Sequence, residues 1–416
     1  MSLIRRATIS DRLASVSARG PGFDQIRLVA ALIVLAHHAW WGVNDVLYQF
    51  SGGFIQLGLF AVVIFFCVSG FLLAPGLVRS GDLVKFAVNR ALRIFPALFV
   101  VVVASMFVLG PALTTYSLAD YFGSPELYSY LKNAVTLMSH YLPGVVRYGH
   151  EVQINGPLWT LNIEIWSYAA LVALSVVGFL GRRVLTLVVW GLFYLAYVAL
   201  AFAPSLHALC PQRLVDFISL FIYFITGTCL YLYGDRIPLS GFWAGLAVGL
   251  ALVGAAGGFS AVVLPLCIPY VVVYCGLSDL AARVPLKHDL SYGVYLIHSP
   301  VILAMVTMFD LQAGWRLATF AALATLILAY ASWRFVEEPA LRQKAPVFNW
   351  VSSRLRTFAR RLRLVIPAAA RQYERRNNVM ENLEADSVQR REGAYTPDLK
   401  AVVRIRRRAL KGAELR

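Results

Sequence analysis

Long apolar blocks recur along the chain, each about twenty residues long and nearly free of charged side chains, which is the length an α-helix needs to cross a bilayer. A backbone surrounded by lipid must satisfy its hydrogen bonds internally, so these blocks are predicted to be helices. Hydrophobic residues make up 59% of the 416 residues and charged residues 14%, whereas soluble domains carry about 45–50% and about 25%. The sequence therefore predicts an all-α polytopic membrane protein and excludes soluble, fibrous and disordered classes for most of the chain.

Ten apolar blocks are predicted to span the membrane. They cover residues 24–43, 54–78, 94–113, 157–180, 184–202, 214–233, 241–259, 261–279, 290–309 and 316–336. The seventh and eighth blocks are rich in glycine and almost touch, so they form either one tight hairpin or a pair that includes a re-entrant piece.

Basic residues predict the orientation of these spans, because cytoplasmic loops carry an excess of Lys and Arg. Such residues gather in the segment 1–22, after the second and fourth blocks and behind the tenth, while the alternate loops 44–53 and 114–156 are poor in them. Both termini are therefore predicted to be cytoplasmic, which an even number of spans allows. The predicted divisions are a cytoplasmic segment 1–22, a ten-helix transmembrane domain 23–340 and a cytoplasmic tail 341–416.

The net charge of +16 belongs mainly to the tail, since residues 341–416 contain 19 Lys and Arg against 7 Asp and Glu, or +12. The tail is predicted to be amphipathic and basic at first, then polar and partly disordered. It is expected to bind anionic lipids at about 1 kcal/mol per basic residue, with docking of a protein partner as the alternative. No nucleic-acid partner is expected.

Cysteine spacing argues against a metal site. The five cysteines form no CxxC pair, and four of them lie inside apolar blocks, where Cys behaves as a small hydrophobic residue. We therefore expect no disulfide framework and no metal.

Four titratable residues lie inside predicted spans: His37, His38, Glu164 and His298. Such residues are costly in a membrane and are candidates for function. At a rise of about 1.5 Å per residue, His38 lies roughly 16 Å beyond Arg27, and Glu164 lies about 10 Å below the outer end of its span. The predicted topology brings His38 and Glu164 to a similar depth, where they suit a base and its orienting partner. The alternative is structural hydrogen bonding, which Pro300 and Tyr295 favour for His298.

Three arginines are predicted at the inner face: Arg27, Arg90 and Arg93. Arg90 and Arg93 are three residues apart and therefore share one face of a helix. Guanidinium groups suit phosphate and pyrophosphate. The alternative is charge that serves only membrane topology and lipid head groups.

Six strings along residues 23–342 resemble, in order, the motifs of the membrane acyltransferase-3 family. They are FDQIRLVAALIVLAHHAW with Arg27 and His38, FAVVIFFCVSGFLL with Ser69, NRALRIFP with Arg90 and Arg93, NGPLWTLNIEIWSY with Trp159 and Glu164, LSYGVYLIHSP with Ser291, Tyr292 and His298, and RFVEEPALR with Glu338 and Pro339. The chain departs from the family in having Ser167 before Tyr168 and a basic tail after the last span.

The resemblance implies an enzyme of the bacterial inner membrane that transfers an acyl group, most often acetyl, from cytoplasmic acyl-CoA to a hydroxyl. The acceptor would be a sugar, a lipid-linked glycan or a secondary metabolite, and acetyl-CoA would be the co-substrate. His38 would act as general base or transient acyl carrier, with Glu164 holding the imidazole. The inner-face arginines would bind the phosphates of the donor.

Further contacts with the acceptor or the thioester are expected from the remaining residues of these motifs. They are His37, Ser69, Trp159, Ser291, Tyr292 and His298. Ser291 or Tyr292 would donate a hydrogen bond to the thioester oxygen.

Two other classes of function remain open. A proton-coupled transporter or flippase of a glycan or lipid intermediate also needs His and Glu inside its spans. A structural scaffold of the cell envelope would use the basic tail as its docking site. An arginine clamp for phosphates favours the enzyme.

Overall fold

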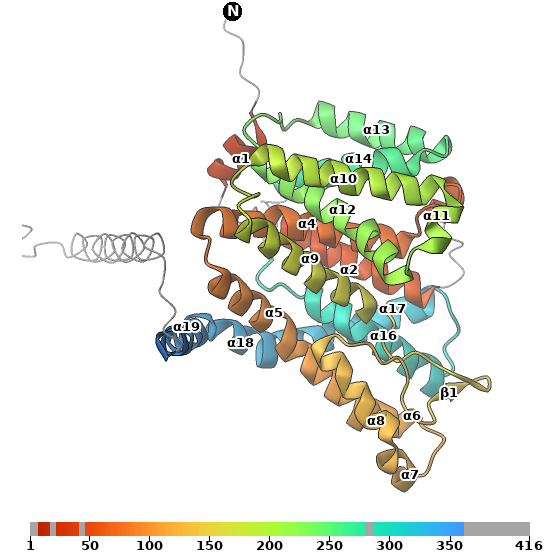
Figure 1. The fold of residues 1–416 in the computed structure, drawn as a ribbon. Coiled ribbons are helices and arrows are strands. Elements are labelled where there is room, and N and C mark those ends of the chain that lie inside the picture. Colours follow the sequence, from red (N-terminus) through yellow and green to blue (C-terminus); the bar gives the residue numbers. More distant parts are fainter. Residues whose placement is uncertain (1–6, 17–21, 41–45, 279–285, 362–416) are drawn as a thin grey trace, which may run out of the picture. The chain divides into compact units, whose positions relative to one another are not determined.

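The computed structural model of the chain describes residues 7–16, 22–40, 46–278 and 286–361. It divides into two units, residues 1–349 and residues 350–416. The described residues are almost entirely helical (Figure 1). The helices are α1 (Ile9–Ser15), α2 (Phe23–Ala39), α3 (Val46–Phe50), α4 (Leu57–Ser80), α5 (Leu83–Ala104), α6 (Gly110–Leu113), α7 (Leu118–Gly123), α8 (Pro125–Ser129), α9 (Leu158–Val176), α10 (Arg183–Phe202), α11 (Pro204–Leu209), α12 (Gln212–Leu232), α13 (Gly241–Ala256), α14 (Ser260–Gly276), α16 (Ser291–Met308), α17 (Trp315–Ser332), α18 (Glu338–Arg342) and α19 (Lys344–Arg361).

Short irregular elements complete this list. Two π-helical segments, Ser105–Leu109 and Trp333–Glu337, join α5 to α6 and α17 to α18, and a 3-10 helix covers Tyr130–Val135. The strands β1 (Val146–Arg147) and β2 (His150–Glu151) form one antiparallel hairpin.

Each of the ten predicted spans overlaps a helix, and residues 41–43 of the first span and 279 of the eighth lie outside the described residues. Seven helical segments of the described chain are long and apolar enough to cross a membrane: Leu57–Ser80, Leu83–Leu113, Leu158–Val176, Arg183–Phe202, Gln212–Leu232, Ser291–Met308 and Trp315–Arg342. The other three helices, α2, α13 and α14, have 17, 16 and 17 residues. The protein is therefore an all-α membrane protein, while the full count of ten spans and the cytoplasmic placement of both termini stay predictions.

The third predicted span starts later than the helix that contains it. Helix α5 begins at Leu83, one residue after Asp82, whose carboxylate accepts a hydrogen bond from the Lys85 backbone N–H at 2.8 Å. This N-cap starts a helix whose first turns carry basic residues. Because these turns are not apolar, they fall outside the span that the apolar pattern predicts. Arg90 and Arg93 consequently lie inside the helix.

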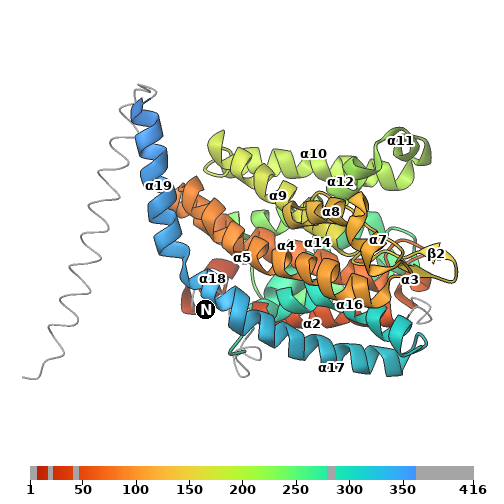
Figure 2. The same cartoon turned by 90° about the horizontal axis from the view of Figure 1, so that it is seen from below.

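Helix α4 lies at the centre of the first unit and packs against α2, α12 and α14 (Figures 1 and 2). Its closest approach is to α12, where a Cβ at Gly70 would lie 1.8 Å from the Phe224 carbonyl oxygen, and one at Gly227 would lie 2.3 Å from that of Cys67. Only glycine allows two helix backbones to approach this closely. The contact fixes the position of Ser69, the residue before Gly70.

Helices α2, α16 and α17 pack on one another and form a second cluster of buried apolar side chains. Its buried members include four alanines, Ala31, Ala39, Ala321 and Ala329, beside larger aliphatic residues. Small residues at such interfaces permit close helix packing in membranes. The polar residues of α2 and α16 are thereby held next to α4 and α9.

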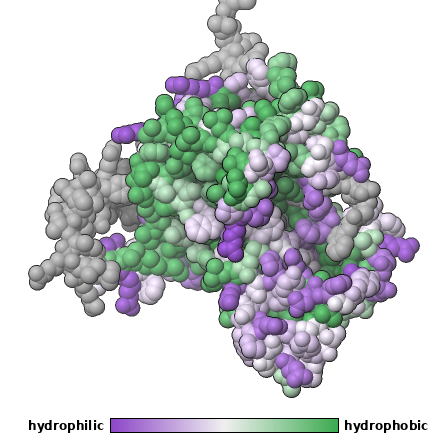
Figure 3. All heavy atoms as spheres, turned by 45° about the vertical axis from the view of Figure 1, so that its right-hand side comes forward, coloured by the Kyte–Doolittle hydropathy of each residue, from purple (hydrophilic) through white to green (hydrophobic). Residues whose placement is uncertain are grey.

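The segment between α6 and α9 forms a polar lobe, visible as the lower part of Figure 3, whereas much of the remaining surface in that view is hydrophobic. Within this lobe the Tyr121 hydroxyl is buried and donates to the Met106 carbonyl oxygen at 2.8 Å, and burial raises the pKa of Tyr121 to about 12. The end of the segment enters the bundle, because the Asn155 side-chain amide donates to the Leu296 carbonyl oxygen of α16 at 2.8 Å.

The described part of the second unit is residues 350–361, the C-terminal part of α19. Its Arg354 guanidinium lies over the Trp350 ring, 5.7 Å from the centroid. The polar stretch predicted for the rest of the tail, residues 362–416, lies outside the described residues.

Candidate active site

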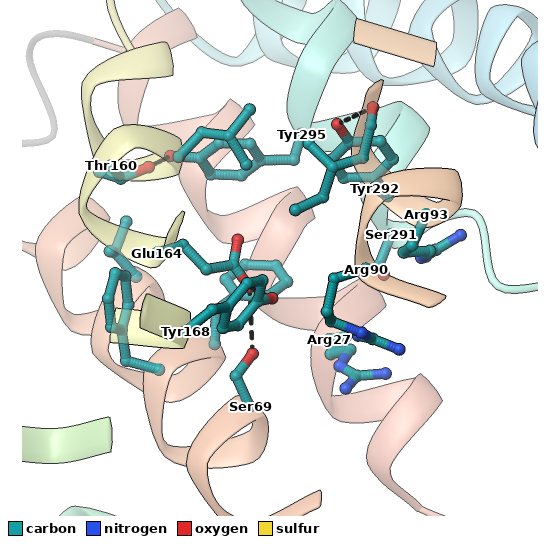
Figure 4. Close-up of a pocket in the computed structure, with 15 residues that line it drawn as sticks. Arg27, Ser69, Arg90, Arg93, Thr160, Glu164, Tyr168, Ser291, Tyr292 and Tyr295 are labelled. Atoms are coloured by element: carbon teal, nitrogen blue, oxygen red, sulfur yellow. Dashed lines mark hydrogen bonds between the residues drawn. The ribbon is translucent and has the colours of Figure 1, made fainter. Parts of the chain in front are cut away.

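A polar cavity of about 90 Å³ lies where α2, α4, α5, α9 and α16 meet (Figure 4). Its polar and aromatic lining consists of Arg27, Phe65, Phe66, Ser69, Arg90, Arg93, Thr160, Glu164, Tyr168, Ser291, Tyr292 and Tyr295. The cavity thus brings together residues from five of the six strings singled out in the sequence.

Helix α9 supplies one wall of this cavity. Thr160, Glu164 and Tyr168 are spaced by four residues and therefore share one helix face. The Glu164 carboxylate accepts hydrogen bonds from the Ser69 hydroxyl at 3.2 Å and from the Tyr168 hydroxyl. Both hydroxyl protons are committed to the carboxylate, which therefore links α9 to α4.

Helix α16 supplies the opposite wall. The Tyr295 hydroxyl is hydrogen bonded to the Thr160 hydroxyl and lies 3.1 Å from the Pro157 carbonyl oxygen. The Tyr292 hydroxyl donates to the Ile94 carbonyl oxygen of α5 at 2.7 Å. Aromatic hydroxyls therefore bind α16 to both α9 and α5.

Arg93 lies in a compact ionic cluster. Its guanidinium donates to Asp289 at 2.6 Å and to Glu337 at 2.8 Å, with Arg93 and Asp289 each 17% exposed and Glu337 only 2% exposed. Burial opposes the ionisation of Asp289, but the guanidiniums of Arg93 and Arg27 hold its pKa below the ordinary value. The Ser291 hydroxyl adds a hydrogen bond to Asp289 at 2.6 Å.

This cluster changes the interpretation of two predictions. Arg93 was expected to bind donor phosphate, but in the structure both of its ends are paired with carboxylates, and it ties α5 to the start of α16 and the end of α17. The hydroxyls of Ser291 and Tyr292 were expected to reach the thioester, but they donate to Asp289 and to the Ile94 carbonyl.

Arg27 and Arg90 are less engaged. The nearest carboxylate to Arg27 is the half-exposed Asp24, one turn earlier on the same helix at 3.5 Å. Arg90 makes no ion pair or hydrogen bond with any other residue that the structure describes. Figure 4 shows both side chains at the same end of the cavity. They are the cationic groups that remain available to an anionic ligand there.

The histidines form a layer next to the cavity. The rings of His38 and His298 lie 5.2 Å apart, and the His298 ring is 5.8 Å from that of Tyr295, which lines the cavity. The His37 ring lies 5.4 Å from His38 and packs against Gly58 of α4. Two residues from distant parts of the sequence, His38 and His298, are thereby brought together.

Backbone carbonyls set the tautomers of both rings. His38 Nδ1 lies 2.8 Å from the Val34 carbonyl oxygen, and His298 Nδ1 lies 2.8 Å from that of Tyr295. Because a carbonyl only accepts, each Nδ1 carries the proton and each Nε2 presents a lone pair. The Nε2 atom of His298 is buried and has no hydrogen-bond partner among the described residues.

This arrangement differs from the predicted pairing of His38 with Glu164. No hydrogen bond joins these two residues in the described structure; the Val34 carbonyl holds His38, and Glu164 binds Ser69 and Tyr168. Trp159 also lies away from the cavity, in a separate groove on another face of α9 with Asn162 and Trp166.

Several polar residues of the site were not singled out in the sequence. They are Thr160, Tyr168, Asp289 and Glu337. The spacing of four residues around Glu164 was a usable signal for Thr160 and Tyr168. In the motif RFVEEPALR, Glu338 faces Arg334 and Arg342 at the surface, whereas its neighbour Glu337 is the buried residue. Among the described residues, no group of three or more His, Cys, Asp or Glu side chains is placed to hold a metal ion.

Comparisons with known proteins agree with the motif order. A family profile described as an acyltransferase domain matches residues 21–334. An O-acetyl transferase of Shigella phage Sf6 is 28% identical over 339 residues, which cover 78% of this chain and 97% of that protein. Nodulation protein 10 of Rhizobium leguminosarum bv. viciae is 31% identical over 356 residues, which cover 77% of this chain and 93% of that protein. No solved structure matches the chain.

Proposed function

Because the chain belongs to the acyltransferase-3 family, we propose that it transfers an acyl group, acetyl in the first instance, from cytoplasmic acyl-CoA to a hydroxyl of a glycan or related acceptor. It would do so as a multi-pass protein of the bacterial inner membrane. The relative named O-acetyl transferase supports the acetyl group and the hydroxyl acceptor.

The proposal rests on which polar side chains in and beside the cavity have partners and which do not. Arg27 and Arg90 line one end without a buried carboxylate partner, and the histidine layer lies beside Tyr295. Phosphate binding needs available guanidinium groups. Acyl transfer to a hydroxyl needs a base with a free lone pair. Both requirements are met within one group of packed helices.

In the proposed reaction, His38 Nε2 accepts the proton of the acceptor hydroxyl. The hydroxyl oxygen attacks the carbonyl carbon of the thioester at the same time. The carbon–sulfur bond then breaks, and the CoA thiolate leaves and takes up the proton. Since the Val34 carbonyl fixes the proton on Nδ1, His38 presents the correct nitrogen without a carboxylate partner. The unpartnered Nε2 of His298 is a second acceptor that can orient the incoming hydroxyl.

Glu164 has a positioning role in this scheme. Its carboxylate holds the Ser69 and Tyr168 hydroxyls and so fixes the wall along which the acyl chain would pass. This role replaces direct contact with the imidazole.

The test is transfer of label from radiolabelled acetyl-CoA to cell-envelope glycans by the purified protein in detergent. Detergent removes any transmembrane gradient, so label in the glycan fraction is expected only from an enzyme. Movement of an unacetylated intermediate in proteoliposomes, with no label transfer, would instead establish the transporter and overturn the proposal. The scaffold alternative predicts no label transfer by the purified protein, and deletion of the tail alone, residues 341–416, would then mimic loss of the whole protein in cells.

A further inference from the structure

Helices α4 and α5 follow one another and are joined by a short turn (Figure 1). A second cavity lies between these helices, close to that turn. It is an open groove of about 400 Å³. Its lining combines apolar and polar side chains: Leu72, Leu73, Pro75, Gly76, Arg79, Ser80, Asp82, Lys85, Phe86, Asn89 and Arg90.

The groove adjoins the active-site cavity. Arg90 lines both spaces. The ring of Phe86, in the groove, packs edge-on against the ring of Tyr168, in the cavity, with centroids 6.1 Å apart. Along both helices the groove continues the cavity towards the α4–α5 turn, from Ser69 to Arg79 on α4. Arg90 is therefore placed to contact a ligand in either space.

The sizes of the two spaces suit different parts of one ligand. Pockets for drug-sized molecules measure about 300–1,000 Å³. The cavity, at about 90 Å³, has room for the acyl end of a donor but not for a nucleotide. The groove, at about 400 Å³, lies in the range that a nucleotide needs.

The charge of the groove favours an anion. Arg79 and Lys85 are exposed, and neither side chain makes an ion pair or hydrogen bond with another described residue. The single acidic residue of the lining, Asp82, is engaged by the Lys85 backbone N–H. With Arg90, three cationic groups therefore face one space against one carboxylate.

The distance between the groove and the cavity matches the donor. Ser69 and Arg79 are ten residues apart on α4, or about 15 Å at 1.5 Å per residue. The pantetheine arm is an extended chain of about a dozen bonds, and at about 3.3–3.6 Å per three bonds it spans about 14 Å. Because the arm begins at the diphosphate, a donor with its diphosphate at Arg90, which lines both spaces, has an arm long enough to bring its thioester to the level of Ser69 and Glu164.

We propose that the α4–α5 groove binds the 3′-phosphorylated ADP end of the acyl-CoA donor, with Arg79 and Lys85 contacting the 3′-phosphate and Arg90 the diphosphate. This inference rests on the proposed function. It adds Arg79 and Lys85 as contacts of the donor. It also places the nucleotide in the groove, because the catalytic cavity is too small to hold it. The half-buried Phe86 offers a face for the adenine ring.

The experiment compares coenzyme A with dephospho-coenzyme A, which lacks only the 3′-phosphate, by calorimetric titration of the detergent-solubilised full chain. The wild-type protein should bind coenzyme A at least about tenfold more tightly than dephospho-coenzyme A, since a hydrogen bond to a charged group is worth that much. Arg79→Ala and Lys85→Ala should each lose most of this preference while binding dephospho-coenzyme A as the wild type does.

Arg182→Ala is the matched control, because Arg182 is an exposed arginine beside α10, in the other predicted cytoplasmic loop, and lines neither space. It should leave both affinities unchanged. If the wild-type protein binds the two ligands equally, or if Arg182→Ala has the same effect as Arg79→Ala, the groove is not the nucleotide site. The proposal that acyl-CoA is the donor is not contradicted by either result. If the wild-type protein binds neither ligand, the proposal that acyl-CoA is the donor is wrong as well.

Discussion

Two polar regions lie along helix α16, and they differ in how completely their polar atoms are paired. At the start of the helix, Asp289 and Glu337 share the guanidinium of Arg93, so that both charges have buried partners. About two turns further on, the ring of His298 is fully buried and its Nε2 has no partner among the described residues. The neighbouring His38 likewise uses only Nδ1.

The difference separates stabilisation from chemistry. A buried ion cluster with every charge paired resists change, because removal of one partner leaves another charge uncompensated. An unpaired buried acceptor lowers the stability of the folded protein. Such an acceptor is expected at functional sites, where a bound substrate donates the missing hydrogen bond. We infer that the Arg93 cluster holds α5, α16 and α17 in place, whereas the histidine layer receives the hydroxyl.

The largest effect is expected from His38→Ala. A general base contributes about 10²–10⁴-fold to rate, so acetyl transfer should fall by that factor while the amount of folded protein stays the same. His37→Ala is the control, since the His37 ring packs against Gly58, whereas the ring that lies 5.2 Å from that of His298 is His38. The measurement is the steady-state rate of label transfer at equal protein concentration. An active His38→Ala variant together with an inactive His37→Ala variant would assign the general base to His37.

Arg93→Ala should act on stability. Leaving Asp289 and Glu337 without their cation should lower the free energy of unfolding by about 3–5 kcal/mol. Arg334→Ala, which removes an exposed pair with Glu338 one turn away, should leave the free energy of unfolding close to that of the wild type. Denaturant titration in micelles measures both variants. Similar losses for the two would show that the buried cluster is no more important than a surface pair.

Arg90→Ala should show the opposite behaviour from Arg93→Ala, although the two residues are one helical turn apart. Loss of a charge-assisted contact should weaken acyl-CoA binding by about 10- to 100-fold, and the loss should shrink at high salt. The unfolding midpoint should stay near that of the wild type, because Arg90 has no ionic partner within the described part of the chain to leave uncompensated. An unchanged dissociation constant, measured at two salt concentrations, would return Arg90 to a role in topology alone.

The apolar blocks predicted the helices well, since the length of a span is set by the bilayer and can be read locally. Each predicted span overlaps a helix, and the two Gly-rich blocks form the separate helices α13 and α14, which pack against each other. The start of α5 was missed because its first turns are amphipathic and basic, so their helical character depends on the Asp82 cap and on packing.

The partners inside the bundle could not be predicted in the same way. Arg93 pairs with residues 196 and 244 positions further along the chain, and only the packing of α5 against α16 and α17 brings them together. Glu164 and His38 were matched by depth, but depth does not fix the direction in which a side chain points. In the structure Glu164 faces Ser69 of α4, and His38 faces α16.

The smallest effect is expected from the stability of His298→Leu, and it bears directly on the contrast between the two regions. The substitution removes a buried nitrogen that has no partner, and an unsatisfied buried acceptor costs about 1–3 kcal/mol. The free energy of unfolding should therefore stay the same or rise by about 1 kcal/mol, while acetyl transfer falls. His207→Leu, on the exposed helix α11, should alter neither quantity. Should His298→Leu unfold as readily as Arg93→Ala, the histidine layer would be part of the structural framework, and the hydroxyl would have to bind elsewhere along the cavity.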